Sequence, residues 1–185
     1  MATKMLADTS LESLVSTHPI AAQFRQRPTS TETRHILRIN DADLPFHLTK
    51  STLSGPDMIP ENPYVFTDDE AGSLVAFYHL GSKLAGHSKI VHGGLAAVLL
   101  DECMGRACFP RLAGGIGVTA KLDISYKNPI PVDSIVVIRA DTKEVQGRKA
   151  WVEAVVEDAR DGKILVEAKA LFIEPKWASE MEKVI

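Results

Sequence analysis

The stretch "GGLAAVLLDECMG", residues 93–105, decides the fold. Its Leu, Ala and Val side chains lie on nearly every side of a helical projection, which predicts a helix that the rest of the chain must enclose. Two features are unexpected in a buried helix. It opens with two glycines, which are poor helix formers, and it contains Asp101 and Glu102, whose carboxylates are costly to bury unless they are paired or used.

Outward from this helix, the sequence predicts strands. One strand is expected over residues 72–80, before the helix, and four follow it, joined by short turns. The later strands are "TAKLDISYKNP", "SIVVIRADTKEV", "KAWVEAVVEDA" and "KILVEAKALFI", and the last three are separated by the turn signals "QGR" and "DG". Because helices do not alternate with these strands, the pattern indicates an antiparallel α+β domain whose sheet curls around the helix.

The first strand after the helix alternates strictly between apolar and polar residues. Such alternation predicts a half-buried strand with one face toward the core. One face would carry Ala120, Leu122, Ile124 and Tyr126, and the other Thr119, Lys121, Asp123 and Ser125.

The N-terminal third of the chain gives weaker signals. The predicted elements are a short helix in "DTSLESLV" capped by Thr9 or Ser10, a helix in "PIAAQFRQR", a strand in "RHILRIN" and an irregular covering segment over residues 44–62. Residues 46–66 are expected to cover a substrate pocket.

Composition excludes several classes of protein. The net charge of −3 and a pI of about 6.1 provide no basic surface of the kind that binds nucleic acid. No stretch has the apolar length of a membrane span. The N-terminus contains Asp8 and Glu12, which argue against a secretory signal and disfavour a mitochondrial presequence, so we expect a cytoplasmic location and keep a mitochondrial one open.

The two cysteines, Cys103 and Cys108, are five residues apart. On a helix they would be separated by about 140° around the axis, which suits neither a disulfide nor a shared metal ion. Buried thiols in a reducing compartment are expected instead.

The two ends of the helix suggest chemistry. A helix N-terminus carries unpaired N–H groups and partial positive charge, so Gly93 and Gly94 could admit a substrate carbonyl to the backbone. A tight strand-to-helix turn would equally explain the two glycines. Asp101 is a candidate base or nucleophile, and the alternative is a hydrated carboxylate near the helix end. Together the two features describe acyl transfer or hydrolysis.

Three blocks in order, "VHGGLAAVLLDECMG", "TAKLDISYKNPIP" and "EVQGRKAWV", resemble the hotdog-fold acyl-CoA thioesterases of the PaaI-like group. The resemblance is especially close to the branch that contains the human thioesterase superfamily members. It implies a five- or six-stranded antiparallel sheet wrapped around one long helix. It also implies three parts of the chain: an N-terminal extension over residues 1–62, the hotdog domain over 63–175 and a tail over 176–185.

The resemblance further implies roles for single residues. Asp101 matches the catalytic carboxylate, Gly93 the donor to the thioester carbonyl, and Thr119 the hydroxyl that orients water. His92 would support the active-site loop. The residues expected to bind substrate are Gly94, Lys127, Arg148 and Lys149, the last two through the phosphates of coenzyme A. No metal and no separate cofactor are implied, because coenzyme A is part of the substrate.

Other motifs give weaker evidence of a function. "GHSKI" lacks the final glycine of a nucleophile elbow and has no surrounding βα repeats. His87 and His92 have no third ligand at a familiar metal-binding spacing. Trp151 and Phe172 are expected in the core or in an interface.

Helix geometry predicts the assembly. Gly93 and Asp101 are eight residues apart, about 12 Å along one helix, so one helix cannot present both groups to one thioester. We therefore expect a homodimer or a dimer of dimers with shared sites. Two alternatives to a thioesterase remain: a non-catalytic acyl-CoA-binding hotdog protein, and a hotdog hydratase or dehydratase.

Overall fold

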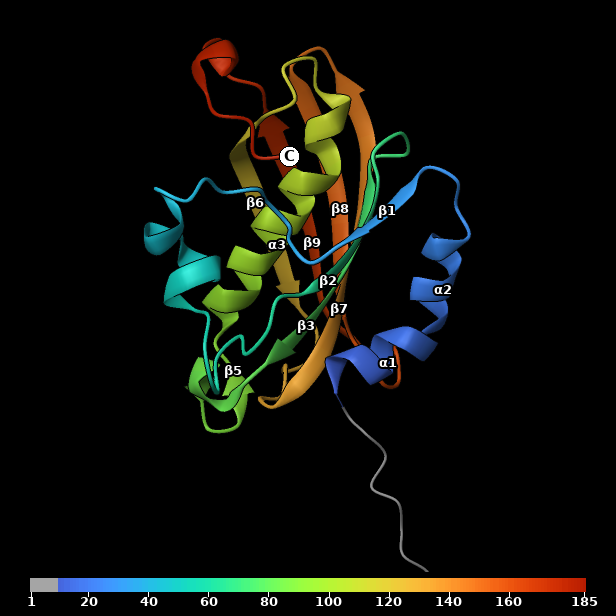
Figure 1. Ribbon diagram of the computed structural model, residues 1–185, viewed down its shortest axis with the longest axis vertical. Coiled ribbons are helices and arrows are strands. Elements are labelled where there is room, and N and C mark those ends of the chain that lie inside the picture. Colours follow the sequence, from blue (N-terminus) through green and yellow to red (C-terminus); the bar gives the residue numbers. More distant parts are fainter. Residues whose placement is uncertain (1–9) are drawn as a thin grey trace, which may run out of the picture.

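The computed structural model describes residues 10–185, in which a curved antiparallel sheet wraps around the helix α3 (Gly93–Cys108), as Figure 1 shows. The seven strands follow the order β1-β2-β3-β7-β8-β9-β6. Their bounds are β1 Ser30–Thr33, β2 Tyr64–Asp68, β3 Ser73–Leu80, β6 Val118–Tyr126, β7 Ser134–Gln146, β8 Lys149–Asp158 and β9 Ile164–Ile173. A small hairpin of β4 (Ala85–His87) and β5 (Ile90–Val91) leads into α3.

The antiparallel α+β architecture, the helix and the five strands predicted around it are confirmed. Both expected turns contain a glycine in the left-handed region, Gly147 between β7 and β8 and Gly162 between β8 and β9. The sheet has more strands than the resemblance implies, because β2 pairs with β3 and β1 pairs with β2. The division of the chain at residues 62 and 175 stays a prediction.

The strand predicted in "RHILRIN", residues 34–40, is wrong. Strand β1 lies just before it, and the chain then leaves the sheet. Its polar groups bond elsewhere: the Arg34 guanidinium donates to the carbonyl oxygens of Asn62 and Pro63, and the Arg38 N–H donates to the carbonyl of Val184. Buried Ile36 anchors this crossing to the core. The apolar alternation therefore reflects an irregular segment that is packed on one side.

The core encloses α3. Strands β3, β7, β8 and β9 turn alternate side chains toward it, as a half-buried sheet requires. The fully buried side chains at its centre include Leu99, Leu100, Met104, Ile138 and Phe172. Cys103 and Cys108 are buried free thiols, as expected.

The opposite face of the sheet is partly covered by two short helices, α1 (Leu11–Thr17) and α2 (Pro19–Arg25), visible beside β1–β3 in Figure 1. The Ser10 side chain caps α1 by accepting a hydrogen bond from the Ser13 N–H at 3.2 Å. Thr9, the other cap considered, lies outside the described residues. The two helices bury a second apolar cluster against the sheet, comprising Leu11, Val15, Ala21, Phe24, Phe66, Val75, Phe77, Ile135, Val137 and Ala159.

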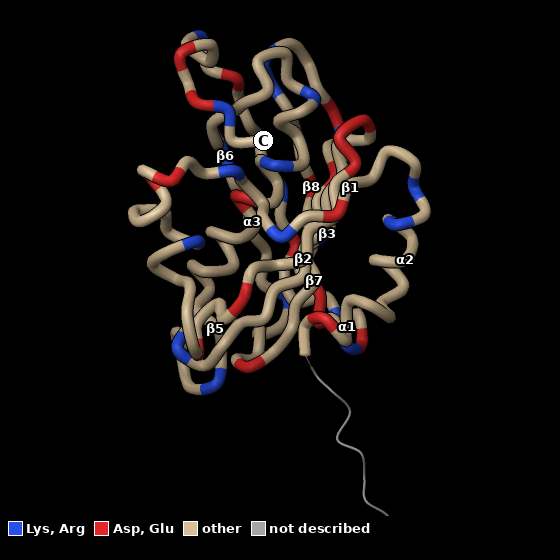
Figure 2. Tube along the Cα trace, viewed as in Figure 1, with Lys and Arg blue, Asp and Glu red and all other residues tan. Residues whose placement is uncertain are grey.

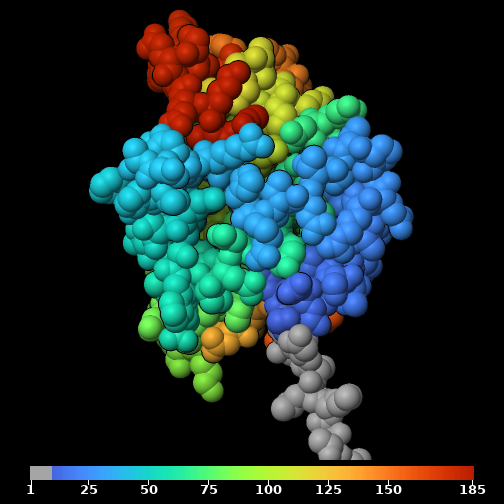
Figure 3. Space-filling view, viewed as in Figure 1, coloured from blue at the N-terminus to red at the C-terminus, as the bar shows by residue number. Residues whose placement is uncertain are grey.

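The segment expected to be irregular, residues 44–62, lies over α3. Figure 3 shows it in pale blue to teal, mainly on the left of the front face. It contains a 3₁₀ turn, Leu44–Phe46, and one turn of π-helix, Leu48–Thr52. We call residues 44–62 the covering segment.

One buried hydrogen-bonded pair fixes the covering segment to α3. The Thr49 hydroxyl lies 2.9 Å and 3.1 Å from the two carboxylate oxygens of Glu102 and donates to them. A cavity of about 20 Å³, large enough for one water molecule, lies beside this pair and is lined by His47 and Tyr78 among others. Burial raises the pKa of Glu102 to about 7; the negative charge of Asp101 adds to the rise, whereas the Thr49 hydrogen bond and Lys50 oppose it.

Basic and acidic positions are interspersed along the chain, as Figure 2 shows. Within residues 10–185, no helix is long and apolar enough to cross a membrane.

The second apolar cluster, between the sheet and the helices α1 and α2, predicts how a core substitution changes the free energy of unfolding. Phe77 is fully buried and packs edge-on against Phe66, with ring centroids 6.1 Å apart, and against His18 at 4.9 Å. Phe77→Ala should lower the free energy of unfolding by about 3–5 kcal/mol, because it leaves a cavity. The matched control is Phe46→Ala, at a side chain that is 85% exposed, which should change it by less than about 0.5 kcal/mol. Denaturant unfolding measures both, and equal effects would contradict this packing.

Glu102 predicts a pH dependence of stability. Its folded-state pKa of about 7 exceeds the ordinary glutamate value of 4.5, so the folded protein binds this proton more tightly than the unfolded chain. The stabilisation is complete below the unfolded pKa and is lost as the pH rises through about 7. Glu102→Gln removes that loss, so the variant should gain about 2 kcal/mol relative to the wild type between about pH 5 and pH 8.

The control for this experiment is Glu144→Gln, at an exposed residue of β7. Its difference from the wild type should stay nearly constant over the same pH range. Urea unfolding at several pH values measures both differences. Parallel pH profiles for Glu102→Gln and the wild type would show that Glu102 titrates alike in the folded and unfolded states.

Candidate active site

The N-terminus of α3 is capped by its own preceding histidine. The His92 Nδ1 accepts a hydrogen bond from the Gly94 N–H at 2.9 Å, and the His92 carbonyl accepts one from the Leu95 N–H, also at 2.9 Å. The Gly93 N–H takes no part in this cap. Of the two glycines expected to face substrate, Gly93 therefore has the freer donor, whereas the Gly94 N–H is already used.

Small residues make room for the His92 ring. A Cβ atom added at Gly94 would lie 2.9 Å from His92 Nδ1, and one added at Gly86 would lie 2.7 Å from His92 Cδ2. Gly86 belongs to β4, so the "GHSKI" stretch forms the hairpin that holds this histidine. This arrangement gives His92 a supporting position at the helix entrance.

Asp101 and Thr119 lie together at the middle of α3. The Thr119 hydroxyl donates a hydrogen bond of 2.5 Å to Asp101 Oδ1. Asp101 is half-buried and Thr119, in β6, is exposed, so this carboxylate is neither simply hydrated nor sealed in the core. Its Oδ2 has no hydrogen bond to any side chain within residues 10–185.

A β-bulge aims Thr119 at the helix. In the pairing of β6 with β9, Thr119 lies opposite the core residue Phe172, and Lys121 lies opposite Leu171, so Ala120 is the extra residue. The predicted alternation, which put Thr119 on the same face as Lys121, is therefore wrong at this position. A bulge shifts the side-chain pattern by one residue, and this shift cannot be read from a regular period of two. Ser125 lies beyond the bulge, opposite Glu167, on the outer face.

A second group surrounds Gly93. The Tyr126 hydroxyl donates to the Gly93 carbonyl at 2.7 Å, and its ring lies 3.3 Å from where a Gly93 Cβ would be. Both residues line an open groove of about 340 Å³ together with Lys127, whose ammonium is 3.0 Å from the Glu167 carboxylate. The sequence assigned Tyr126 to the core face, yet its side chain is 55% exposed. The sequence did contain a signal of this exposure, because Tyr126 is an aromatic residue at the end of a strand and has polar neighbours.

The remaining predicted residues lie elsewhere. Arg148, at the β7–β8 turn, donates from Nη1 to the Glu174 carbonyl at 2.7 Å. Lys149 begins β8 and is exposed. The structure therefore separates the predicted site residues into three places: the helix entrance, the Asp101–Thr119 pair and the hairpin tip.

The distance along the helix separates the first two places. Helix α3 is continuous from Gly93 to Cys108, so Gly93 and Asp101 are about 12 Å apart along its axis. A carbonyl about 3 Å from the Gly93 N–H is out of reach of the Asp101 carboxylate in the same chain.

Glu102 is a polar residue whose role the sequence did not identify. It points from α3 to the covering segment, whereas its neighbour Asp101 points to β6. Two adjacent helical residues are about 100° apart around the axis, so one faces the candidate site and the other fixes its cover. Within the described residues, no cluster of three or more His, Cys, Asp or Glu side chains could hold a metal ion.

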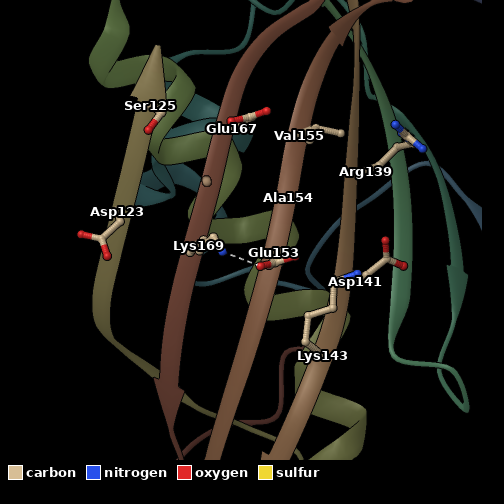
Figure 4. Close-up of a pocket in the computed structure, with 11 residues that line it drawn as sticks. Asp123, Ser125, Arg139, Asp141, Lys143, Glu153, Ala154, Val155, Glu167 and Lys169 are labelled. Atoms are coloured by element: carbon tan, nitrogen blue, oxygen red, sulfur yellow. Dashed lines mark ion pairs between the residues drawn. The ribbon is translucent and has the colours of Figure 1, made fainter. Parts of the chain in front are cut away.

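A depression of about 450 Å³ on the outer face of the sheet lies away from all these groups. Figure 4 shows its charged side chains projecting from β6–β9 on the side opposite α3. Lys169 and Glu153 form an ion pair there at 2.8 Å. None of the predicted catalytic residues lines it, so we do not assign the reaction to this surface.

Comparisons with known proteins agree with this geometry. The family model of the thioesterase superfamily matches residues 88–165, from the β4–β5 hairpin to the start of β9. A Candida albicans (strain WO-1) protein, named only as an uncharacterized mitochondrial protein, is 39% identical over 71% of this chain and 61% of its own length. The acyl-coenzyme A thioesterase THEM4 of Mus musculus is 34% identical over 54% of this chain and 42% of its own. The chain thus spans about half the length of such curated relatives.

Solved structures share the architecture. A thioesterase superfamily protein of 28% identity has a TM-score of 0.53, covering 60% of this chain and 53% of that chain. A Streptococcus mutans UA159 protein bound to acetyl CoA has a TM-score of 0.52 at 16% identity, covering 55% of this chain and 80% of that chain, a likeness that shows the fold alone. The sheet wrapped around α3 is the hotdog fold, and residues 88–165 carry the sequence pattern of the thioesterase superfamily.

Proposed function

We propose that the protein is an acyl-CoA thioesterase, which hydrolyses an acyl-CoA to a carboxylic acid and coenzyme A. The observation that carries the proposal is the Asp101–Thr119 pair, a carboxylate and a hydroxyl 2.5 Å apart. The Thr119 proton is directed to Asp101 Oδ1, so the hydroxyl oxygen is left to accept from a water molecule. The Asp101 carboxylate is then positioned to take a proton from that water, or to attack the thioester carbonyl itself.

The Gly93 N–H supplies the second requirement of this chemistry, a donor for the oxyanion that develops on the thioester carbonyl. Because 12 Å of helix separates it from Asp101, about four times the reach of a hydrogen bond, we propose that each site takes Gly93 from one protomer and Asp101 from the other. Two antiparallel α3 helices in a two-fold dimer satisfy this requirement. The outer strand β6, whose free edge is exposed, is available for such pairing.

Two other functions are less well supported. A non-catalytic acyl-CoA-binding protein has no need of the Asp101–Thr119 pair. A hydratase or dehydratase needs a histidine at the reacting atoms, whereas His92 Nδ1 is occupied in capping α3. A thiol-release assay with acyl-CoAs of several chain lengths separates hydrolysis from both alternatives.

We further propose a mitochondrial location. The cytoplasmic location expected from the sequence has no support among the relatives, and names of relatives include a mitochondrial protein of Candida albicans (strain WO-1) and a mitochondrial membrane protein of Saccharomyces cerevisiae (strain ATCC 204508 / S288c). Fractionation of cells that express the tagged protein tests this directly.

Asp101→Asn should abolish most of the hydrolysis without unfolding the protein, because the amide has the same shape and cannot accept a proton. The expected loss in kcat is about 10²- to 10⁴-fold. Asp123→Asn, at an exposed carboxylate on the outer face of β6, is the matched control and should keep wild-type activity. Near wild-type turnover by folded Asp101→Asn would remove Asp101 from the mechanism.

Mixed dimers test the shared site. Asp101→Ala and Gly93→Pro should each be inactive, the second because proline lacks the N–H while being tolerated in the first turn of a helix. After co-refolding in equal amounts, half of the dimers are mixed and each has one intact site, so about a quarter of wild-type activity should return. Circular dichroism of each variant controls for folding. Verified mixed dimers without activity would contradict the shared site.

A further inference from the structure

The backbone at the entrance of α3 has few restraints of its own. Gly93 and Gly94 have no Cβ atom, so their backbone dihedral angles are freer than those of any other residue type. The proposed reaction nevertheless uses the Gly93 N–H as a donor, and such a donor is effective only when it is held in place before the reaction. Contacts from the surrounding residues must therefore fix this part of the backbone.

The peptide group between Gly93 and Gly94 is held at both ends. Its N–H donates to His92 Nδ1 at 2.9 Å, and its carbonyl oxygen accepts from the Tyr126 hydroxyl at 2.7 Å. The first contact is local, because His92 and Gly94 are near neighbours in the sequence, whereas the second comes from β6, 33 residues away. The Tyr126 hydroxyl thus connects the helix entrance to the sheet.

The ring of Tyr126 adds a steric restraint. A Cβ atom at Gly93 would lie 3.3 Å from Cε1, Cζ and the hydroxyl oxygen of Tyr126. The ring therefore lies directly against the Gly93 backbone and limits its movement on that side. This contact also gives a reason for glycine at position 93, since a side chain there would force the ring, and with it the hydroxyl, to shift.

The backbone that carries Tyr126 is itself fixed at the end of β6. Tyr126 pairs with Val166 of β9, a residue that is fully buried. The N–H groups of Lys127 and Asn128 both donate to the Leu165 carbonyl, at 2.9 Å and 3.0 Å. The end of β6 is therefore a firm support for the Tyr126 side chain.

Burial does not explain why a tyrosine occupies position 126. The Tyr126 side chain is 55% exposed, so packing in the core is not its main contribution. The hydroxyl has one proton to donate, and it donates this proton to the Gly93 carbonyl. Both residues line the open groove of about 340 Å³, so this contact lies where a substrate would meet the Gly93 N–H.

We propose that Tyr126 is a positioning residue for the Gly93 N–H. Its hydroxyl holds the Gly93–Gly94 peptide from the side of the sheet, so the N–H of Gly93 keeps a constant direction while charge develops on the thioester carbonyl. The inference rests on the proposed function, in which Gly93 is the oxyanion donor. Strand β6 then supports both halves of the proposed chemistry, because it also carries Thr119, the partner of Asp101.

The kinetics of Tyr126→Phe test this role, because phenylalanine keeps the ring and removes only the hydroxyl. With the acyl-CoA that the wild type hydrolyses fastest, kcat should fall about 3- to 10-fold, the effect of one lost hydrogen bond, while KM stays within about twofold. The matched control is Tyr64→Phe on β2, where the ring lies against the Arg34 guanidinium, and it should keep both constants. A loss confined to KM, or no loss, would overturn the positioning role.

Amide hydrogen exchange measures the same contact without turnover. Nuclear magnetic resonance should show the Gly94 N–H exchanging about 3- to 10-fold faster in Tyr126→Phe than in the wild type, because its peptide group loses one of two restraints. The amides of buried Leu99 and Leu100 should exchange unchanged, which separates a local effect from a loss of stability. Tyr64→Phe should match the wild type at all three positions.

The two readouts separate this proposal from the proposed function. Unchanged exchange at Gly94 in Tyr126→Phe would overturn the positioning role even if the wild type is an active thioesterase. Faster exchange at Gly94 alone, with no acyl-CoA hydrolysis by the wild type, would support the restraint on this peptide and overturn the thioesterase. Faster exchange at Gly94, Leu99 and Leu100 alike would show general destabilisation and would also overturn the positioning role.

Discussion

The removal of α3 from water is the constraint on which the rest of the structure depends. A helix with Leu99, Leu100 and Met104 on different sides has no face that can be left to solvent. One sheet covers it only partly, so the sheet must curve and the covering segment must close the remaining side. The long irregular stretch before the core strands, which has little secondary structure of its own, is explained by this requirement.

The same constraint determines what the two acids do. A carboxylate on an enclosed helix needs a partner, and Asp101 and Glu102 each meet a threonine hydroxyl, from β6 and from the covering segment respectively. Their surroundings differ in burial. Glu102 is largely desolvated and has its pKa raised to about 7, whereas Asp101 lies at the open edge of the sheet. Adjacent residues of one helix thus serve a structural contact and the proposed reactive site.

The helix also fixes the distance between the two parts of the candidate site. Its N-terminus presents the Gly93 N–H and its middle presents Asp101. Because these two groups are about 12 Å apart on one rigid element, the proposed site combines them from two helices.

The sequence by itself determined α3 and the five core strands around it, in their order along the chain. Apolar periodicity located α3, and alternation with turn glycines located β3 and the four strands after α3, because these signals are local. The resemblance pointed to Asp101, Thr119, Gly93 and His92, and the structure brings the first two into contact and the last two to the helix entrance. Only the tertiary structure decided which face Thr119 takes, since the bulge at Ala120 is defined by pairing with β9. Likewise, only folding brings Thr49 to Glu102, 53 residues away, and Tyr126 to Gly93. Those contacts depend on strand register and chain crossing, which join distant residues and leave no periodic signal in the sequence.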